Sequence, residues 1–303
     1  MASGSGQKQA TDVKFKHFNI VPEASDHYYR NSNRSNTFSN ANSSVHRAIM
    51  REWRSLEKNL PELIYVQVYE TRIDLLRAVI IGAEGTPYHN GLFFFDFCLP
   101  YDYPRQPPKV YYRSHGLYLN PNLYADGKVC LSLINTWPGE KWTQNSTILQ
   151  VLVSIQGLVL NERPFFNEPI VAGAKKSKSS IWIKQSVAYS KHVFILSCKT
   201  MLYQMRNPPK NFENFVSQHF CERADSILAA VKAYQENNLL VGSCSIKPSS
   251  SFKSKLRKIQ TELEKAFDRV PEPNVNKSEK LEDIKKPKYG LVNKFMMCIW
   301  NKD

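Results

Sequence analysis

The sequence lacks the cysteine patterns that mark disulfide-linked and zinc-binding domains. Its six cysteines are scattered, with no CxxC pair among them, at positions 98, 130, 198, 221, 244 and 298. This spacing predicts neither a disulfide framework nor a zinc site. Cys98 and Cys198 fall within apolar runs and are expected to be packed thiols. A reducing compartment, in which thiols stay free, is therefore expected.

Long apolar runs are also missing. No stretch of about 18 apolar residues occurs, so no segment is predicted to span a bilayer. Residues 1–10 are rich in Gly, Ser and Gln and lack the apolar core of a signal peptide. No internal repeat is visible. The expected location is the cytoplasm, the nucleus or both.

Apolar residues and positive charge are both plentiful. Of the 303 residues, 42% are hydrophobic and 12% aromatic, which is enough for a substantial core. The formal net charge is +14, and residues 247–303 hold 14 Lys or Arg against 8 Asp or Glu. Such a balance is compatible with nucleic acid, an anionic membrane or an acidic partner. A solvated tail is the simpler interpretation. Specific nucleic-acid binding is not predicted, and membrane contact of the tail is left open.

The distribution of polar residues divides the chain into three parts. Residues 1–42 are polar, with Asn and Ser crowded toward their end, and are expected to be mostly disordered. Residues 43–240 carry the periodic patterns of one folded domain. Residues 241–303 form a basic tail that is expected to be largely disordered, with amphipathic helices within it.

The periodic patterns predict an α+β fold. Apolar residues at spacings of three and four from Val45 to Leu60 predict an amphipathic helix, capped by Ser43 or Ser44 and ended by Pro61. Apolar or alternating runs predict four strands, which short turns would join into an antiparallel meander; they cover residues 64–69, 74–81, 92–99 and 109–112. After a long irregular segment, helical patterns resume near residue 145 and at 183–205, 209–220 and 223–234.

One short run within the irregular segment carries chemistry. Asn122 stands eight residues before Cys130, behind a Pro turn and a Gly-containing turn. A side-chain amide held near one thiol suits an acyl-thioester: the amide donates to the carbonyl oxygen, and the sulfur is first nucleophile and then leaving group. Long irregular segments are usually functional when they occur in compact domains.

This run, Asn-Pro-Asn followed by Gly-Lys-Val-Cys-Leu, resembles the active-site segment of ubiquitin-conjugating enzymes. The Pro-Tyr-His-Asn-Gly-Leu-Phe run at 87–93 and the Tyr-Pro-Arg-Gln-Pro-Pro run at 103–108 resemble two further motifs of the family. The resemblance covers roughly residues 43–234. It is closest to the large hybrid conjugating-enzyme/ligase subgroup and its plant relatives. It implies an N-terminal helix, a four-stranded meander, an active-site loop and C-terminal helices, with a cis Tyr103–Pro104 bond.

The resemblance implies an acyltransferase in which Cys130 carries ubiquitin as a thioester. Asn122 matches the asparagine credited with oxyanion stabilisation or with bracing the loop. Glu168 matches an acidic residue beside the incoming lysine, although a plain turn before Pro169 explains it equally well. Asn120, which replaces the family's usual histidine, would support the loop, as would Asn167 and Trp142. The exposed stripe of Arg47, Arg51 and Arg54 would contact the activating enzyme.

The implied partners are ubiquitin, its activating enzyme and protein substrates that offer lysine. The Trp137–Trp142 insertion and the altered neighbouring loops weaken the case for ordinary RING-ligase pairing and favour substrate recognition by the chain itself, so a separate ligase is left open. No metal or cofactor is expected, since ATP is used by the activating enzyme. The alternative is a catalytically weakened variant of the fold that binds ubiquitin or a partner, and Asn120 keeps that alternative open.

Overall fold

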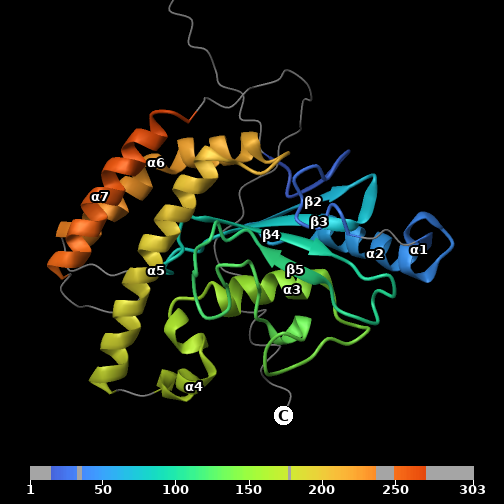
Figure 1. The fold of residues 1–303 in the computed structure, drawn as a ribbon, viewed down its shortest axis with the longest axis horizontal. Coiled ribbons are helices and arrows are strands. Elements are labelled where there is room, and N and C mark those ends of the chain that lie inside the picture. Colours follow the sequence, from blue (N-terminus) through green and yellow to red (C-terminus); the bar gives the residue numbers. More distant parts are fainter. Residues whose placement is uncertain (1–14, 33–35, 177–178, 237–248, 271–303) are drawn as a thin grey trace, which may run out of the picture. The chain divides into compact units, whose positions relative to one another are not determined.

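A computed structural model describes residues 15–32, 36–176, 179–236 and 249–270, all within one compact unit, Asp12–Pro273. Its strands are β1 (Phe18–Val21), β2 (Ile64–Tyr69), β3 (Arg72–Ile81), β4 (Leu92–Cys98) and β5 (Lys109–Tyr112). Its α-helices are α1 (Asn36–Ser39), α2 (Ser44–Asn59), α3 (Ile148–Ser154), α4 (Pro169–Ala172), α5 (Ser180–Arg206), α6 (Glu213–Glu236) and α7 (Ser250–Phe267) (Figure 1). None of the described helices is both long and apolar enough to cross a membrane.

The strands form one sheet in the order β1-β2-β3-β4-β5. Strands β2 to β5 are an antiparallel meander, as predicted, whereas β1 adds a fifth strand parallel to β2. The predicted four-stranded antiparallel sheet is therefore wrong in one respect: the sheet is five-stranded and mixed. A four-residue edge strand that presents one buried residue, Val21, is too short to show an alternating pattern.

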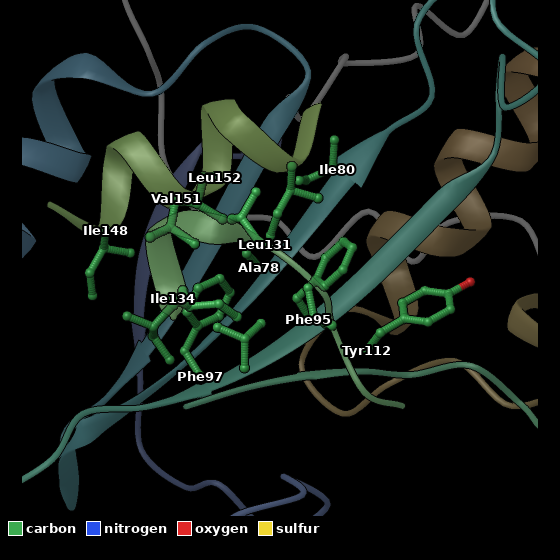
Figure 2. Close-up of a cluster of buried hydrophobic side chains, with 14 of the residues drawn as sticks. Ala78, Ile80, Phe95, Phe97, Tyr112, Leu131, Ile134, Ile148, Val151 and Leu152 are labelled. Atoms are coloured by element: carbon green, nitrogen blue, oxygen red, sulfur yellow. The ribbon is translucent and has the colours of Figure 1, made fainter. Parts of the chain in front are cut away.

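One face of the sheet packs against α2 and α3. Ile148, Val151 and Leu152 of α3 point toward Ala78, Ile80, Phe95 and Phe97 of the central strands (Figure 2). All of these side chains are buried because alternate residues of each strand face the helices. Ser43 caps α2 by accepting from the His46 amide at 3.0 Å, as predicted. This core fixes α3, whose far end supports the candidate site.

The other face of the sheet is covered as well. Near one end, Val79, Ile81, Leu92 and Phe94 pack against α5, α6 and α7 (Figure 1). Near the other, Arg77 pairs with Asp96 at 2.6 Å, and both side chains are fully buried. The same pair holds the segment after β1, because Arg77 also bonds Asp26, and Asp96 accepts from the Tyr28 amide.

The termini of the described region carry more structure than the sequence suggested. The segment 1–42 was expected to be mostly disordered, but its described part includes β1 and a stretch held by the Arg77–Asp96 pair. The amphipathic helix within the tail is present as α7, with Phe252, Leu256, Ile259 and Leu263 buried. The two patterns at 209–220 and 223–234 form one continuous helix, α6. The rest of the tail, 271–303, lies outside the described residues.

Candidate active site

The run from Leu119 to Leu131 folds into a tight double turn beside the sheet. The Leu119 amide donates to the Leu123 carbonyl at 3.0 Å, and the Cys130 amide donates to the Asn122 carbonyl at 2.8 Å. Gly127 has a φ of +88°, and a Cβ there would stand 2.0 Å from the Tyr111 ring. The left-handed backbone and the close aromatic ring both require glycine at this position. This geometry brings Asn122 opposite Cys130.

Asn122 is aimed at the backbone of Cys130 rather than at its sulfur. Its Nδ2 donates to the Cys130 carbonyl oxygen at 2.8 Å. Its Oδ1 is buried and accepts no hydrogen bond from the described residues. Of the two roles considered for this asparagine, the observed contact fits bracing of the loop. Contact with an acyl oxygen on the sulfur requires the side chain to turn.

Asn120 is completely buried, and both its amide nitrogen and its amide oxygen form hydrogen bonds. Its Nδ2 donates to the Tyr88 hydroxyl at 2.8 Å and to the Val159 carbonyl at 3.1 Å. Its Oδ1 accepts from the Asn122 amide at 2.8 Å. Asn120 thus ties the loop to the π-helix that follows α3 and to the connection between β3 and β4. It does so at the position where the family usually has histidine. The substitution leaves a supported loop.

The Cys130 thiol is covered, since the residue exposes only 2% of its surface. Burial raises the pKa of the thiol, Lys128 opposes that shift, and Asp126 and Glu168 add to it. The neighbouring Tyr124 hydroxyl also lowers the pKa of the thiol. Lys128 in turn lies over the Tyr124 ring, with Nζ 5.5 Å from the centroid. At neutral pH the sulfur is therefore mainly the protonated thiol.

Glu168 lies close enough to act on Cys130 electrostatically, and it also raises the pKa of Tyr118 and Tyr189. It is half-buried between the turn Pro164–Asn167 and α4. Among the described residues no group bonds or pairs with its carboxylate. The neighbouring Asn167 points elsewhere: its Nδ2 donates to the Val159 carbonyl at 3.2 Å, and its Oδ1 accepts from Asn161 at 2.6 Å.

Trp142 joins the site's outer loop to the cis Tyr103–Pro104 bond, which is present as expected. Its Nε1 donates to the Pro104 carbonyl at 2.8 Å, and its ring lies 5.9 Å from the Tyr103 ring. Its backbone amide donates to Asn135 Oδ1 at 3.1 Å. Trp142 therefore supports the loops and does not touch the thiol.

The three arginines of α2 are exposed on one side of that helix, opposite its buried face. Arg47 bonds the Asn42 carbonyl at 2.7 Å and Arg54 the Met50 carbonyl at 3.0 Å, so neither is neutralised by a carboxylate in the described structure. The stripe remains a predicted docking surface for the activating enzyme. It is not part of the site around Cys130.

Four residues near the site were not singled out from the sequence. They are Tyr118, Tyr124 and Lys128, beside the sulfur, and Asn161, which holds Asn167. Tyr124 and Lys128 belong to the motif run, and the turn at Gly127, which places them on facing arms, was the available signal. Asn161 offers no such signal, because it follows a helix among polar neighbours.

Comparison with known proteins agrees with this geometry. The family described as "Ubiquitin-conjugating enzyme" matches residues 48–195. "Putative ubiquitin-conjugating enzyme E2 38" of Arabidopsis thaliana is 50% identical over 228 residues, which cover 73% of this chain and 68% of that protein. "Probable ubiquitin-conjugating enzyme E2 24" of the same plant is 45% identical over 274 residues, covering 87% of this chain and 30% of that protein.

The fold is of the α+β class, with an N-terminal helix, a five-stranded mixed sheet and C-terminal helices. The chain belongs to the ubiquitin-conjugating enzyme family. It is also 36% identical over 241 residues to the human "Dual E2 ubiquitin-conjugating enzyme/E3 ubiquitin-protein ligase BIRC6", a match that covers 72% of this chain and 5% of that protein. The chain thus spans about a third of the first plant relative and far less of the human one.

Proposed function

We propose that Cys130 accepts ubiquitin as a thioester from an activating enzyme and passes it to a lysine of a protein substrate. Membership of the family supports a transferase, and the route through this sulfur is the further step. In loading, the Cys130 sulfur forms a bond to the acyl carbon while the activating enzyme's C–S bond breaks. In transfer, the lysine nitrogen forms the C–N bond, and the departing thiolate takes up a proton.

The observation that carries this proposal is the pairing of Asn122 with Cys130 across the tight loop, with Glu168 nearby. No base bonded to the sulfur is needed, because exchange between thioesters is nearly balanced in energy and the acyl donor is already activated. A lysine amine is different, since it must lose a proton to attack. Glu168, whose carboxylate is unengaged among the described residues, is suited to orient that amine and take its proton.

The cover over the sulfur must move before loading. Tyr124 is half-buried and influences the pKa of the thiol, while Tyr118 exposes 44% of its surface and meets Tyr124 edge-on at 5.2 Å. Neither ring is fully buried, and rotation of Tyr124 is the movement proposed to open the sulfur. Exposed rings can change rotamer on the nanosecond scale, far faster than acyl transfer.

The partners follow from the same proposal. Ubiquitin and its activating enzyme supply the acyl group, and the arginine stripe of α2 is the proposed contact for the activating enzyme. The printed name of the human relative includes ligase activity, and ligase-like recognition of substrates is proposed for this chain as well. The proposed location is the cytoplasm or nucleus, and the chain is proposed to need no metal or cofactor of its own.

The proposal is tested by incubating the full chain with activating enzyme, ATP and ubiquitin. A reductant-sensitive adduct is expected for the wild type. Cys130→Ser should give a reductant-resistant ester, and Cys130→Ala should give neither. Cys221→Ser, which changes an exposed thiol of α6 outside the loop, serves as the matched control and should load normally. A wild-type chain that forms no adduct, or an adduct unaffected by Cys130→Ala, contradicts the proposal.

A further inference from the structure

The end of helix α3 has backbone carbonyls that side-chain amides satisfy. The helix continues into a π-turn, Ile155–Val159, and stops there. Carbonyls at a helix C-terminus have no partner within the helix. The Leu158 carbonyl accepts from Asn161 Nδ2 at 2.7 Å. The Val159 carbonyl accepts from two amides, Asn120 Nδ2 at 3.1 Å and Asn167 Nδ2 at 3.2 Å.

One carbonyl therefore joins the two segments that form the candidate site. Asn120 belongs to the loop of Cys130, and its Oδ1 holds the Asn122 amide. Asn167 directly precedes Glu168 in the chain. Two hydrogen bonds to the Val159 oxygen thus connect the loop of the thiol to the segment that carries Glu168. No other hydrogen bond among the described residues links these two segments.

Asn161 completes the connection on the Glu168 side. Its Nδ2 donates to Asn167 Oδ1 at 2.6 Å, and its Oδ1 accepts from the Arg163 amide at 2.9 Å. Both ends of the Asn167 amide are consequently held, one by Asn161 and the other by Val159. The Glu168 carboxylate makes no hydrogen bond or ion pair of its own in the described structure. Its position must come from the backbone that Asn167 fixes.

We propose that Asn161 is a positioning residue for lysine transfer: by locking Asn167 onto the end of α3, it holds the Glu168 carboxylate at a set distance from the Cys130 sulfur. This rests on the proposed function. Asn161 does not touch the thiol and has no part in loading. Its effect should be confined to the step in which an amine must be oriented and lose a proton, where misplacement of about 1 Å can cost roughly 100-fold in rate.

The test uses purified ubiquitin-loaded chain in single-turnover reactions with two nucleophiles. Asn161→Ala should load at the wild-type rate and discharge to free lysine about 10-fold or more slowly. Discharge to hydroxylamine should stay near wild type, because hydroxylamine is uncharged at neutral pH and needs no carboxylate to take its proton. Asn145→Ala, an exposed asparagine on the outer loop, is the matched control and should change neither rate. Unfolding by urea confirms that each variant is folded.

A double-mutant cycle separates positioning from a general disturbance of the loop. Combined with Glu168→Gln, Asn161→Ala should slow lysine discharge no further, because residues acting through one group do not add. Additive losses, an equal fall with hydroxylamine, or wild-type lysine discharge by Asn161→Ala would each overturn the inference while leaving the thioester intact. A wild-type chain that never loads would instead remove the proposed function, and the inference with it.

Discussion

Asn122 illustrates how one side chain can support a reaction without facing the reacting atom. Its contact with the Cys130 carbonyl fixes the backbone that carries the sulfur. Its Oδ1 is buried and accepts no hydrogen bond from the described residues, so the amide is only partly engaged. The observed contact fits bracing, and oxyanion stabilisation after a turn of the side chain is the proposed second use of the same residue.

We expect Asn122→Ala to slow lysine transfer about 100- to 1000-fold, the usual cost of one lost preorganised donor. Loading should suffer less, because exchange between thioesters is the easier step. Single-turnover loading and discharge, measured separately, check this expectation. Asn122→Asp keeps the shape but removes the donor, so it should resemble the alanine variant. Equal loss in both steps would contradict a role specific to transfer.

Tyr124 influences the ionisation of the thiol. Burial raises the pKa of Cys130, and the neighbouring Tyr124 hydroxyl opposes that rise by favouring the thiolate. Tyr124→Phe should raise the pKa further and move the pH profile of alkylation by iodoacetamide to higher pH. A hydrogen bond worth about 1 kcal/mol corresponds to a rate roughly fivefold lower at neutral pH. Tyr118→Phe is the matched control, and a profile unchanged by Tyr124→Phe contradicts the assignment.

At the scale of elements, α7 serves as the cover of a second core. Its Leu256 is fully buried in the cluster that α7 shares with α5 and α6. Leu256→Ala should lower the free energy of unfolding by about 2–5 kcal/mol, the usual cost of a cavity at such a site. Lys255→Ala, one residue away and exposed, should change it by less than about 0.5 kcal/mol. Urea denaturation of both variants measures the difference, and equal midpoints would show that α7 is not docked.

The periodicity of apolar residues in the sequence predicted the helices and strands that bury a whole face against the core. In helices α2 and α7 the buried residues recur every three or four positions, and strands β2 to β5 coincide with apolar or alternating runs. It failed for the segment 15–32, which is attached by the pairing of β1 with β2 and, farther along, by hydrogen bonds to the distant Arg77–Asp96 pair. An ion pair between strands adjacent in space but 19 residues apart leaves no periodic trace.

For the candidate site, too, some features were predictable from the sequence and others were not. The family resemblance named Cys130, Asn122 and Glu168; in the structure Asn122 bonds the Cys130 carbonyl and Glu168 acts on the thiol electrostatically, while their catalytic roles stay predictions. The direction of the Asn122 amide, the Tyr124 cover and the role of Asn161 were not predictable, because they depend on rotamers set by packing and on where α3 stops. Side-chain direction is decided by neighbours that only the folded chain assembles.

At the scale of the whole molecule, neutral histidines buried between helices and sheet make stability depend on pH. His219 of α6 is 3% exposed, and its Nε2 lies 2.9 Å from the Asn90 carbonyl at the β3–β4 turn. Burial lowers its pKa to about 3, and burial also lowers the pKa of His27 and of His89. His219 is thus kept neutral in the folded chain well below the pH at which free histidine becomes charged, and the pKa shifts of His27 and His89 have the same direction.

The sign of the effect follows from proton binding. The unfolded chain, with an ordinary histidine pKa of about 6.5, binds more protons than the folded chain below that pH, so stability falls as acid is added. From pH 7.5 to 5, His219 alone should cost about 2 kcal/mol. His219→Gln keeps a donor for Asn90 but cannot titrate, so the difference between urea unfolding at the two pH values should shrink by that amount. If the variant loses as much stability as the wild type, protonation of His219 does not loosen α6 from the sheet.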